Sequence, residues 1–168
     1  MTAEPISLVG NLMAGKKGLI MGLANDRSIA WGIAKALASQ GAEIALTYQG
    51  DALLKRVKPL AEQLGATQVI ECDVASDESM DQTFTELEKA WGKFDFIVHA
   101  IGYSDKDELK GEYLNTSRAN FLMSMDISVY SFTAICKRAE NLLNDGGSLI
   151  TLTYHGAQQV MPHYNVMG

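Results

Sequence analysis

The sequence predicts an α/β domain in which helices cover both faces of a parallel β-sheet. Two observations support this fold class. Short apolar runs that look buried on both faces alternate with longer segments whose apolar residues have helical spacing. Right-handed crossovers between successive strands then give a Rossmann-like, doubly wound sheet in three layers. Strands are expected at residues 17–22, 43–48, 67–74, 94–102 and 146–154.

The segments between the strands carry the start signals of helices. The first helix is expected to begin at the N-cap Ser28, and the third at the N-cap Ser76. The second helix, over residues 51–65, contains Pro59. Because proline lacks a backbone donor, we expect a break or restart there.

The second half of the chain is less regular before its last strand. Residues 103–116 are polar and carry no periodic pattern. A long helix is predicted over about 118–143, with an interruption near Asp126.

Composition and charge exclude several classes of protein. The 168 residues are 47% hydrophobic and 20% charged, which is typical of one globular domain over residues 1–168. The net charge of −6, without clustered Lys or Arg, argues against a nucleic-acid surface. No apolar stretch suggests a membrane span, and the N-terminus lacks the pattern of a signal peptide. Cys72 and Cys136 fit neither a metal site nor a disulfide framework, so we expect no metal and a cytoplasmic protein.

The turn after the first strand, "GLANDRSIAWG", is typical of a phosphate-binding turn. Gly22 would let the chain leave the strand sharply, and Ser28 opens a helix whose free amides attract a diphosphate. Gly32 would let that helix pack closely on the strand or on a ligand. The spacing differs from G-x-G-x-x-G, so an ordinary glycine-rich turn with a serine cap explains this stretch equally well when it is considered alone.

Two further strand ends favour a dinucleotide site. Asp73 and Val74 follow the third strand and could hold an adenine edge, while Ala100 and Gly102 are small enough to let a cofactor approach the backbone. Taken singly, Asp73 could be a turn residue and His99 a core histidine. Three such strand ends on one edge of the sheet favour binding of a dinucleotide.

The end of the second strand bears on the choice of cofactor. Gln49 stands where many NAD-binding domains place an acid, and Asp51 follows. No arginine stands directly at the strand end to attract a 2′-phosphate, although Lys55 and Arg56 come one turn later. NADH is therefore favoured over NADPH.

Several stretches together resemble bacterial enoyl-[acyl-carrier-protein] reductase, a divergent branch of the short-chain dehydrogenase/reductases. The resemblance extends from about Leu12 to Gly168. It implies reduction of the 2,3 double bond of an enoyl thioester on acyl carrier protein by NADH, in fatty-acid biosynthesis, by proteins that are usually homo-oligomers. The stretches that carry it are "GLANDRSIAWGIAKALASQGAEIALTYQ", "CDVASD", "FDFIVHAIGYSDKDEL", "MDISVYSF" and "LITLTYHGAQQVMPHYNVMG".

The resemblance also implies roles for individual residues. The family's two active-site tyrosines fall on Tyr154, which would line the substrate pocket, and on Tyr164, which would stabilise the enolate oxygen by hydrogen bonding. Without the resemblance, Tyr154 could simply cover the core, and Ile127 could be helix core. The residues implied to contact the cofactor are Gly22, Ser28, Ile29, Gln49, Asp73, Val74, Ala100, Ile101, Gly102 and Ile127.

Lysine spacing separates the branches of this superfamily. Typical short-chain dehydrogenases carry Tyr-x-x-x-Lys, but Gln158 and Gly168 stand at those positions here, which disfavours a carbonyl reductase. The enoyl-reductase branch uses Tyr-x6-Lys, and that lysine would fall beyond Gly168, as would the family's C-terminal strands. We therefore expect a polypeptide that ends at Gly168 to be catalytically impaired. A non-catalytic nucleotide-binding remnant and a carbonyl reductase are the alternative interpretations.

Overall fold

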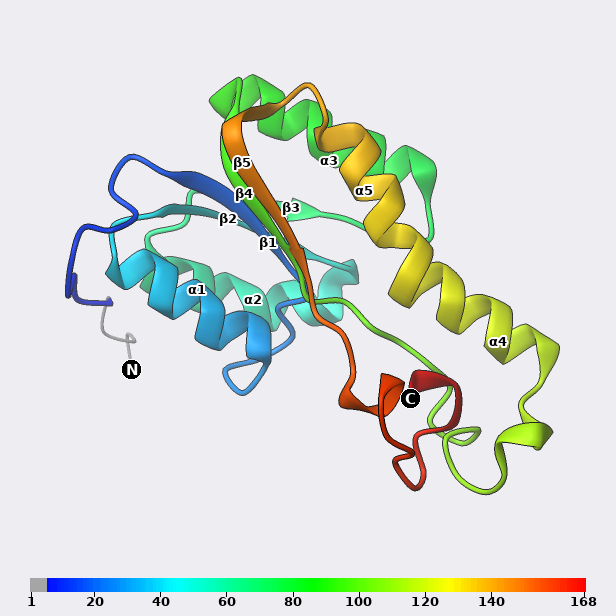
Figure 1. Cartoon of the computed structure of the whole chain (residues 1–168). Helices are drawn as coiled ribbons and strands as arrows, with labels where there is room; N and C mark the ends of the chain where they lie inside the picture. Colours follow the sequence, from blue (N-terminus) through cyan, green and yellow to red (C-terminus); the bar gives the residue numbers. More distant parts are fainter. Residues whose placement is uncertain (1–5) are drawn as a thin grey trace.

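The computed structural model describes residues 6–168 and shows one parallel sheet in the order β3-β2-β1-β4-β5 (Figure 1). Residues 1–5, where the N-terminal stretch considered for a signal peptide begins, lie outside the described residues. The sheet confirms the predicted fold class and leaves β5 at one edge. The strands are β1 Lys17–Met21, β2 Glu43–Tyr48, β3 Gln68–Glu71, β4 Phe94–His99 and β5 Leu143–Thr151.

Helices cover both faces of this sheet, as predicted (Figure 1). One face carries α1 (Ile29–Ser39) and α2 (Gly50–Leu64), and the other carries α3 (Asp77–Trp91) and α5 (Ser131–Ala139). The helix α4 (Arg118–Met125) precedes α5 and extends past the sheet toward the C-terminal segment (Figure 1). No helix among residues 6–168 is both long and apolar enough to cross a membrane.

Side chains that alternate between the two faces of the strands form two hydrophobic cores, one on each face of the sheet. Leu19 and Met21 of β1 belong to the core beneath α3 and α5. Ile20, between them, belongs with Leu46 and Val98 to the core beneath α1 and α2. Since successive side chains of a strand point to opposite faces, one short strand contributes to both cores. This accounts for strands that are apolar throughout their length.

The predicted break in the second helix is wrong. The helix α2 continues through Pro59, which lies on its exposed face, while Val57, Leu60 and Ala61 are buried against the sheet. Proline leaves the carbonyl of Lys55 without its helical donor, but water can reach that side of the helix. Packing of the buried face therefore outweighs the loss of one exposed hydrogen bond.

The predicted interruption near Asp126 is confirmed. A π-helical turn, Asp126–Tyr130, separates α4 from α5, so the long helix is continuous in direction but changes its hydrogen-bond pattern there. The helix ends at Ala139, earlier than predicted. Ser76 caps α3 as predicted, because its hydroxyl accepts from the Ser79 amide at 3.2 Å.

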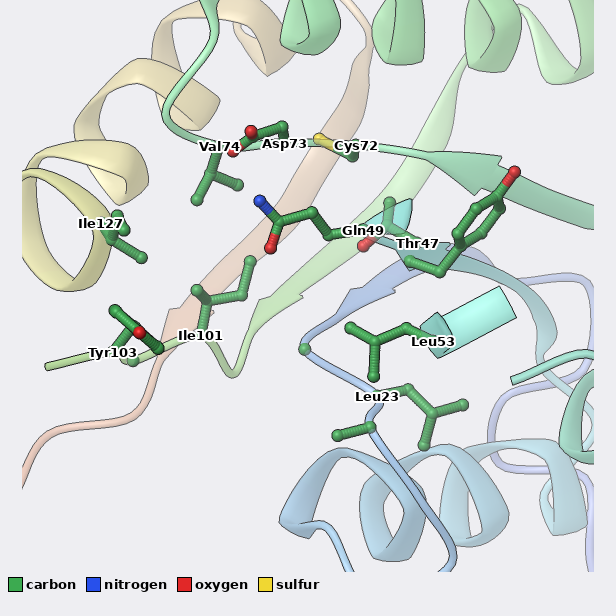
Figure 2. Close-up of a pocket in the computed structure, with 14 residues that line it drawn as sticks. Leu23, Thr47, Gln49, Leu53, Cys72, Asp73, Val74, Ile101, Tyr103 and Ile127 are labelled. Atoms are coloured by element: carbon green, nitrogen blue, oxygen red, sulfur yellow. The ribbon is translucent and has the colours of Figure 1, made fainter. Parts of the chain in front are cut away.

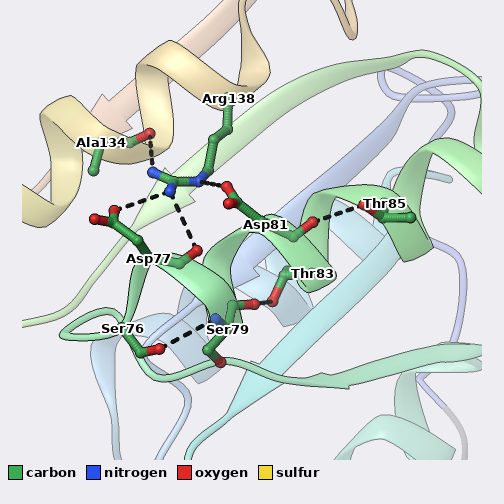
Figure 3. A network of polar contacts seen from close by, with 8 residues as sticks. All are labelled: Ser76, Asp77, Ser79, Asp81, Thr83, Thr85, Ala134 and Arg138. Atoms are coloured by element: carbon green, nitrogen blue, oxygen red, sulfur yellow. Dashed lines mark hydrogen bonds and ion pairs between the residues drawn. The ribbon is translucent and has the colours of Figure 1, made fainter.

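Arg138 ties α5 to the start of α3 (Figure 3). Its guanidinium donates to the carboxylates of Asp81, at 2.6 Å, and Asp77, at 2.9 Å. A third bond, at 3.2 Å, reaches the carbonyl of Ala134 on its own helix. The arginine side chain is only 15% exposed, whereas both carboxylates are largely exposed, so the pairs fix the position of two helices more than they stabilise the fold.

Asp95 ties together three segments at the amino end of the sheet. Its carboxylate accepts from the Lys17 amide at 2.9 Å, from Lys16 Nζ at 3.0 Å and from Asn144 Nδ2 at 3.1 Å. Burial alone would raise the pKa of Asp95, but these donors outweigh it, so its pKa lies below the ordinary value. The carboxylate thereby joins β1, β4 and the irregular start of β5.

Substituting Asp95→Asn removes the charge and keeps the shape, so we expect the free energy of unfolding at pH 7 to fall by about 1–2 kcal/mol. The folded-state pKa of Asp95 lies below the unfolded-state value of about 3.9, so its stabilisation is present above that pH and is lost as the pH falls through the lower, folded-state pKa. Urea unfolding at pH 7 and at pH 3 should therefore show a difference between parent and variant that shrinks at the lower pH. Asp145→Asn, at an exposed position, is the matched control. An equal difference at both pH values would contradict this account.

Candidate functional site

A cavity of about 410 Å³ lies at the carboxyl ends of the strands (Figure 2). The cavity lies where the order of the parallel strands reverses, since β2 and β3 extend from one side of β1 and β4 lies on the other. Ligands of doubly wound sheets bind at this kind of position. The residues that line it are Gly22, Leu23, Ala24, Thr47, Tyr48, Gln49, Leu53, Cys72, Asp73, Val74, Ile101, Gly102, Tyr103 and Ile127.

The structure brings together seven of the predicted cofactor residues. They come from the ends of four strands and from the π-helical turn, namely Gly22, Gln49, Asp73, Val74, Ile101, Gly102 and Ile127. Three others, Ser28, Ile29 and Ala100, lie outside the cavity wall, as do the two predicted active-site tyrosines, Tyr154 and Tyr164. The cavity therefore combines segments that are far apart in the sequence.

The remaining lining residues were not predicted. Most lie within two positions of predicted residues, so the same strand ends could have indicated them: Leu23, Ala24, Thr47, Tyr48, Cys72 and Tyr103. Leu53 has no such signal, because it enters the cavity only through the direction of α2 (Figure 2).

Gly22 forms the floor of the turn after β1. Its φ of 89° is a conformation that other residues rarely adopt, and a Cβ atom there would lie 2.0 Å from the carbonyl oxygen of Ala100. The Ala100 amide donates to the Met21 carbonyl at 3.2 Å, which holds the two strand ends together. The close approach of β1 and β4 thus requires glycine at this position. Gly32 differs, since a Cβ atom there would meet open space, and its expected packing on the strand is wrong.

Ser28 caps α1 as predicted. Its hydroxyl accepts from the Trp31 amide at 3.4 Å and donates to the Asn25 carbonyl at 2.7 Å. The first-turn amides of a helix, Ile29 among them, have no carbonyl of the same helix to pair with, and they carry the positive end of the helix dipole. The Ile29 side chain is 68% exposed. Since the Ser28 amide already donates to the Asn25 carbonyl at 3.2 Å, any role of this turn toward an anion belongs to the amides of the first helical turn, beginning with that of Ile29.

Asp73 is fixed by its own loop. Its Oδ1 atom accepts from the Ala75 amide at 2.9 Å, and its amide donates to Ser79 Oγ at 2.9 Å. Its Oδ2 atom has no hydrogen bond among residues 6–168, so this oxygen can accept from a ligand in the cavity. Val74 and Gln49 lie beside it, with the Gln49 side chain extended into the cavity (Figure 2).

His99 is a buried core histidine, as the simpler interpretation held. Ser131 Oγ donates to the Ile127 carbonyl at 2.7 Å and so accepts from His99 Nε2 at 2.8 Å. His99 Nδ1 then accepts from the Thr151 hydroxyl at 3.1 Å. Burial lowers the pKa of His99 and keeps the ring neutral. This chain of bonds joins the ends of β4 and β5 to the π-helical turn that presents Ile127.

Ser128, the next residue of that turn, fixes Tyr103. Its hydroxyl accepts from the Tyr103 amide at 2.9 Å and lies 3.1 Å from the Tyr103 carbonyl, to which it donates. The π-helical turn therefore positions both Ile127 and Tyr103 at one end of the cavity.

The two predicted active-site tyrosines, Tyr154 and Tyr164, lie against each other. Their ring centroids are 4.5 Å apart, although β5 ends at Thr151 and leaves Tyr154 in the following loop. Hydrogen bonding with the Tyr164 phenol raises the pKa of Tyr154 above the ordinary tyrosine value. Met167, which follows in the same segment, lies near Gly102, since a Cβ atom there would be 3.3 Å from Met167 Cε. The C-terminal segment that carries Tyr164 therefore reaches the end of the cavity at Gly102, although neither tyrosine lines it.

A family model described as enoyl-(acyl carrier protein) reductase matches residues 22–168, which include the whole of this site. The chain belongs to the enoyl-(acyl carrier protein) reductase family.

Named relatives of this reductase family are close in sequence. The chain is 67% identical over 157 residues to enoyl-[acyl-carrier-protein] reductase [NADH] 1 of Rhizobium meliloti, covering 94% of this chain and 58% of that protein. It is 49% identical over 157 residues to the corresponding Escherichia coli enzyme, covering 93% of this chain and 60% of that one. The chain thus spans less than two thirds of the length of these reductases.

Solved reductase structures share the fold. An enoyl-(acyl-carrier-protein) reductase from Anaplasma phagocytophilum, crystallised in complex with NAD, is 57% identical with a TM-score of 0.94, over 96% of this chain and 62% of that one. A Bacillus cereus reductase, crystallised with NADP+ and an indole naphthyridinone, is 41% identical with a TM-score of 0.91, over 94% of this chain and 62% of that one.

Gly22→Ala and Gly32→Ala provide a matched test of the turn after β1. Gly22→Ala should lower the free energy of unfolding by about 2 kcal/mol or more, because it combines an unfavourable φ with a backbone clash. Gly32→Ala should raise it by about 0.5–1 kcal/mol, since alanine favours the helix and the Cβ meets open space. Urea unfolding of both variants measures the difference. Equal effects of the two substitutions would show that the β1–β4 approach does not require glycine.

Proposed function

We propose that the cavity binds NADH and that the protein acts as an enoyl-[acyl-carrier-protein] reductase, which reduces the 2,3 double bond of enoyl thioesters in fatty-acid biosynthesis. The observation that carries this proposal is the cavity at the switch point of the sheet, lined by Gly22, Asp73 and Gly102. The NADH-dependent names of the relatives and the complex of a structural neighbour with NAD support the choice of cofactor.

The residues present fit a dinucleotide. The cavity volume of about 410 Å³ lies within the usual range of ligand sites, and its walls are mostly apolar with a few polar groups, among them Gln49 and Asp73. Asp73 and Gln49 would hold the adenosine, and Gly22 with the first amides of the helix that Ser28 caps, beginning with that of Ile29, would hold the diphosphate. The end of the cavity formed by Ile101, Gly102 and Ile127, with Ala100 next to it in the chain, would take the nicotinamide half. The bound cofactor supplies the hydride.

The tyrosines serve the substrate in this proposal. When the double bond is reduced, negative charge develops on the thioester oxygen, and a hydroxyl that donates to this oxygen stabilises the charge. Tyr164 takes this role, and Tyr154 lines the substrate pocket beside it. The Tyr154 hydroxyl is engaged with the Tyr164 phenol, an interaction that raises the pKa of Tyr154, so it holds Tyr164 in place beside the substrate.

The partners and surroundings follow from the same proposal. The substrate is an enoyl group carried as a thioester on acyl carrier protein, as the names of the relatives indicate. We propose a homo-oligomer that works in the cytoplasm without a nucleic-acid or membrane partner, which the net charge of −6 supports.

Binding of NADH tests the cavity directly. Asp73→Asn keeps an oxygen for the Ala75 amide and removes the charge that would accept from the adenine amino group. Its Kd for NADH, measured by titration of nicotinamide fluorescence, should rise about tenfold, as for the loss of one charged hydrogen bond. Asp145→Asn is the matched control and should leave the Kd unchanged. Equal affinities for the two variants would place the nucleotide elsewhere.

Turnover of a crotonyl thioester with NADH tests the catalytic proposal. Tyr164→Phe should lower kcat about a hundredfold, because the hydrogen bond to the enolate oxygen is lost, and should leave the Kd for NADH unchanged. Tyr113→Phe, at an exposed position, should have no effect. A parent protein that binds NADH without turnover would agree with the impairment expected of a polypeptide that ends at Gly168, and it would contradict catalysis by this chain and support a nucleotide-binding role.

A further inference from the structure

At the start of α2, a backbone amide donates a hydrogen bond to a carboxylate from the neighbouring strand β3. Glu71, the last residue of β3, accepts from the Gly50 amide through Oε1 at 3.2 Å. Gln49, the N-cap of this helix, makes no side-chain capping bond. The carboxylate of Glu71 therefore lies at the positive end of the α2 dipole and occupies one of its first amides.

This corner adjoins the cavity wall at several points. Gln49 and Cys72, which directly neighbour Gly50 and Glu71 in sequence, both line the cavity (Figure 2). Tyr48, another lining residue, is the register partner of Glu71 across the β2–β3 pair. The carboxylate therefore stands at the end of the second strand, where doubly wound folds place the adenosine ribose.

The charges around this corner are acidic. Burial raises the pKa of Tyr48, and the negative charges of Glu71, Asp51 and Glu86 raise it further. Arg56 lines a different surface groove, with Asn25, Asp26, Trp31, Lys35, Leu60 and Gln63. Among the described residues, no cation that lines the cavity balances these carboxylates.

We propose that Glu71 determines the choice between the two nicotinamide cofactors, because its carboxylate takes the helix position that a 2′-phosphate would need. A helix N-terminus with a free amide binds phosphate readily, whereas one already paired with a carboxylate repels it. The ribose hydroxyls of NADH carry no charge and are compatible with the acidic corner. This inference rests on the proposed function, in which the cavity holds a nicotinamide dinucleotide.

Two substitutions separate the charge of Glu71 from its occupation of the amide. Glu71→Gln removes the charge but keeps an oxygen for the Gly50 amide, and Glu71→Ala removes both. The ratio of the Kd for NADPH to the Kd for NADH, measured by fluorescence titration, should fall about threefold in Glu71→Gln and about tenfold in Glu71→Ala. The Kd for NADH should change less than about twofold in either variant. Glu78→Gln, on the exposed surface of α3, is the control and should leave the ratio unchanged.

The outcomes distinguish this inference from the proposed function. An unchanged ratio in Glu71→Gln, with the parent affinity for NADH retained, would overturn the role of Glu71 and leave the NADH site standing. Failure of the parent protein to bind NADH would overturn the proposed function and this inference with it. Because Glu71→Gln keeps the capping oxygen, it tests the charge even if Glu71→Ala weakens the fold, and thermal unfolding of both variants shows which case applies.

Discussion

The site depends on the close approach of two backbones where β1 and β4 leave the sheet. Gly22 lies against the Ala100 carbonyl, at a distance that no side chain would permit. The amide of Ala100 closes this junction by donating to Met21. Because the chain turns to opposite sides of the sheet beyond this point, the two loops diverge and leave the cavity between them. A bulkier residue at position 22 would separate the strands and change the shape of the floor.

Buried hydrogen bonds fix the position of the other end of the cavity, where Ile127 lies. The buried chain from Thr151 through His99 and Ser131 ends on the Ile127 carbonyl. A neutral histidine suits this place, since it donates at one nitrogen and accepts at the other without a buried charge. In the π-helical turn that this chain supports, Ile127 lines the cavity. The next residue, Ser128, holds the loop at Tyr103 through two hydrogen bonds. Local helix geometry, strand ends and the cavity wall are thereby coupled.

The sequence predicted the alternation of strands and helices, the serine caps and half of the cavity wall, because apolar spacing and capping are local signals. It placed the ends of β3, β4 and β5 at Val74, Gly102 and Tyr154, whereas they fall at Glu71, His99 and Thr151. The residues in between include apolar ones such as Val74 and Ile101 that line a cavity instead of extending a strand. Composition cannot separate these two uses of apolar residues, since both bury the side chain. Leu53 and Glu71 escaped prediction because their roles arise from the packing of α2 against β3.

The helices α1 and α2 follow strand ends that line the cavity, and their first amides are satisfied differently. The helix α1 is capped by the neutral hydroxyl of Ser28, which leaves the positive end of its dipole available to an anion. The helix α2 has the carboxylate of Glu71 against Gly50, which neutralises the same feature. A dinucleotide carries its charge at the diphosphate and not at an unmodified ribose, so its diphosphate is favoured at α1 and its adenosine at α2. The opposite orientation would bring phosphate to a carboxylate and leave the unneutralised helix end facing an uncharged ring.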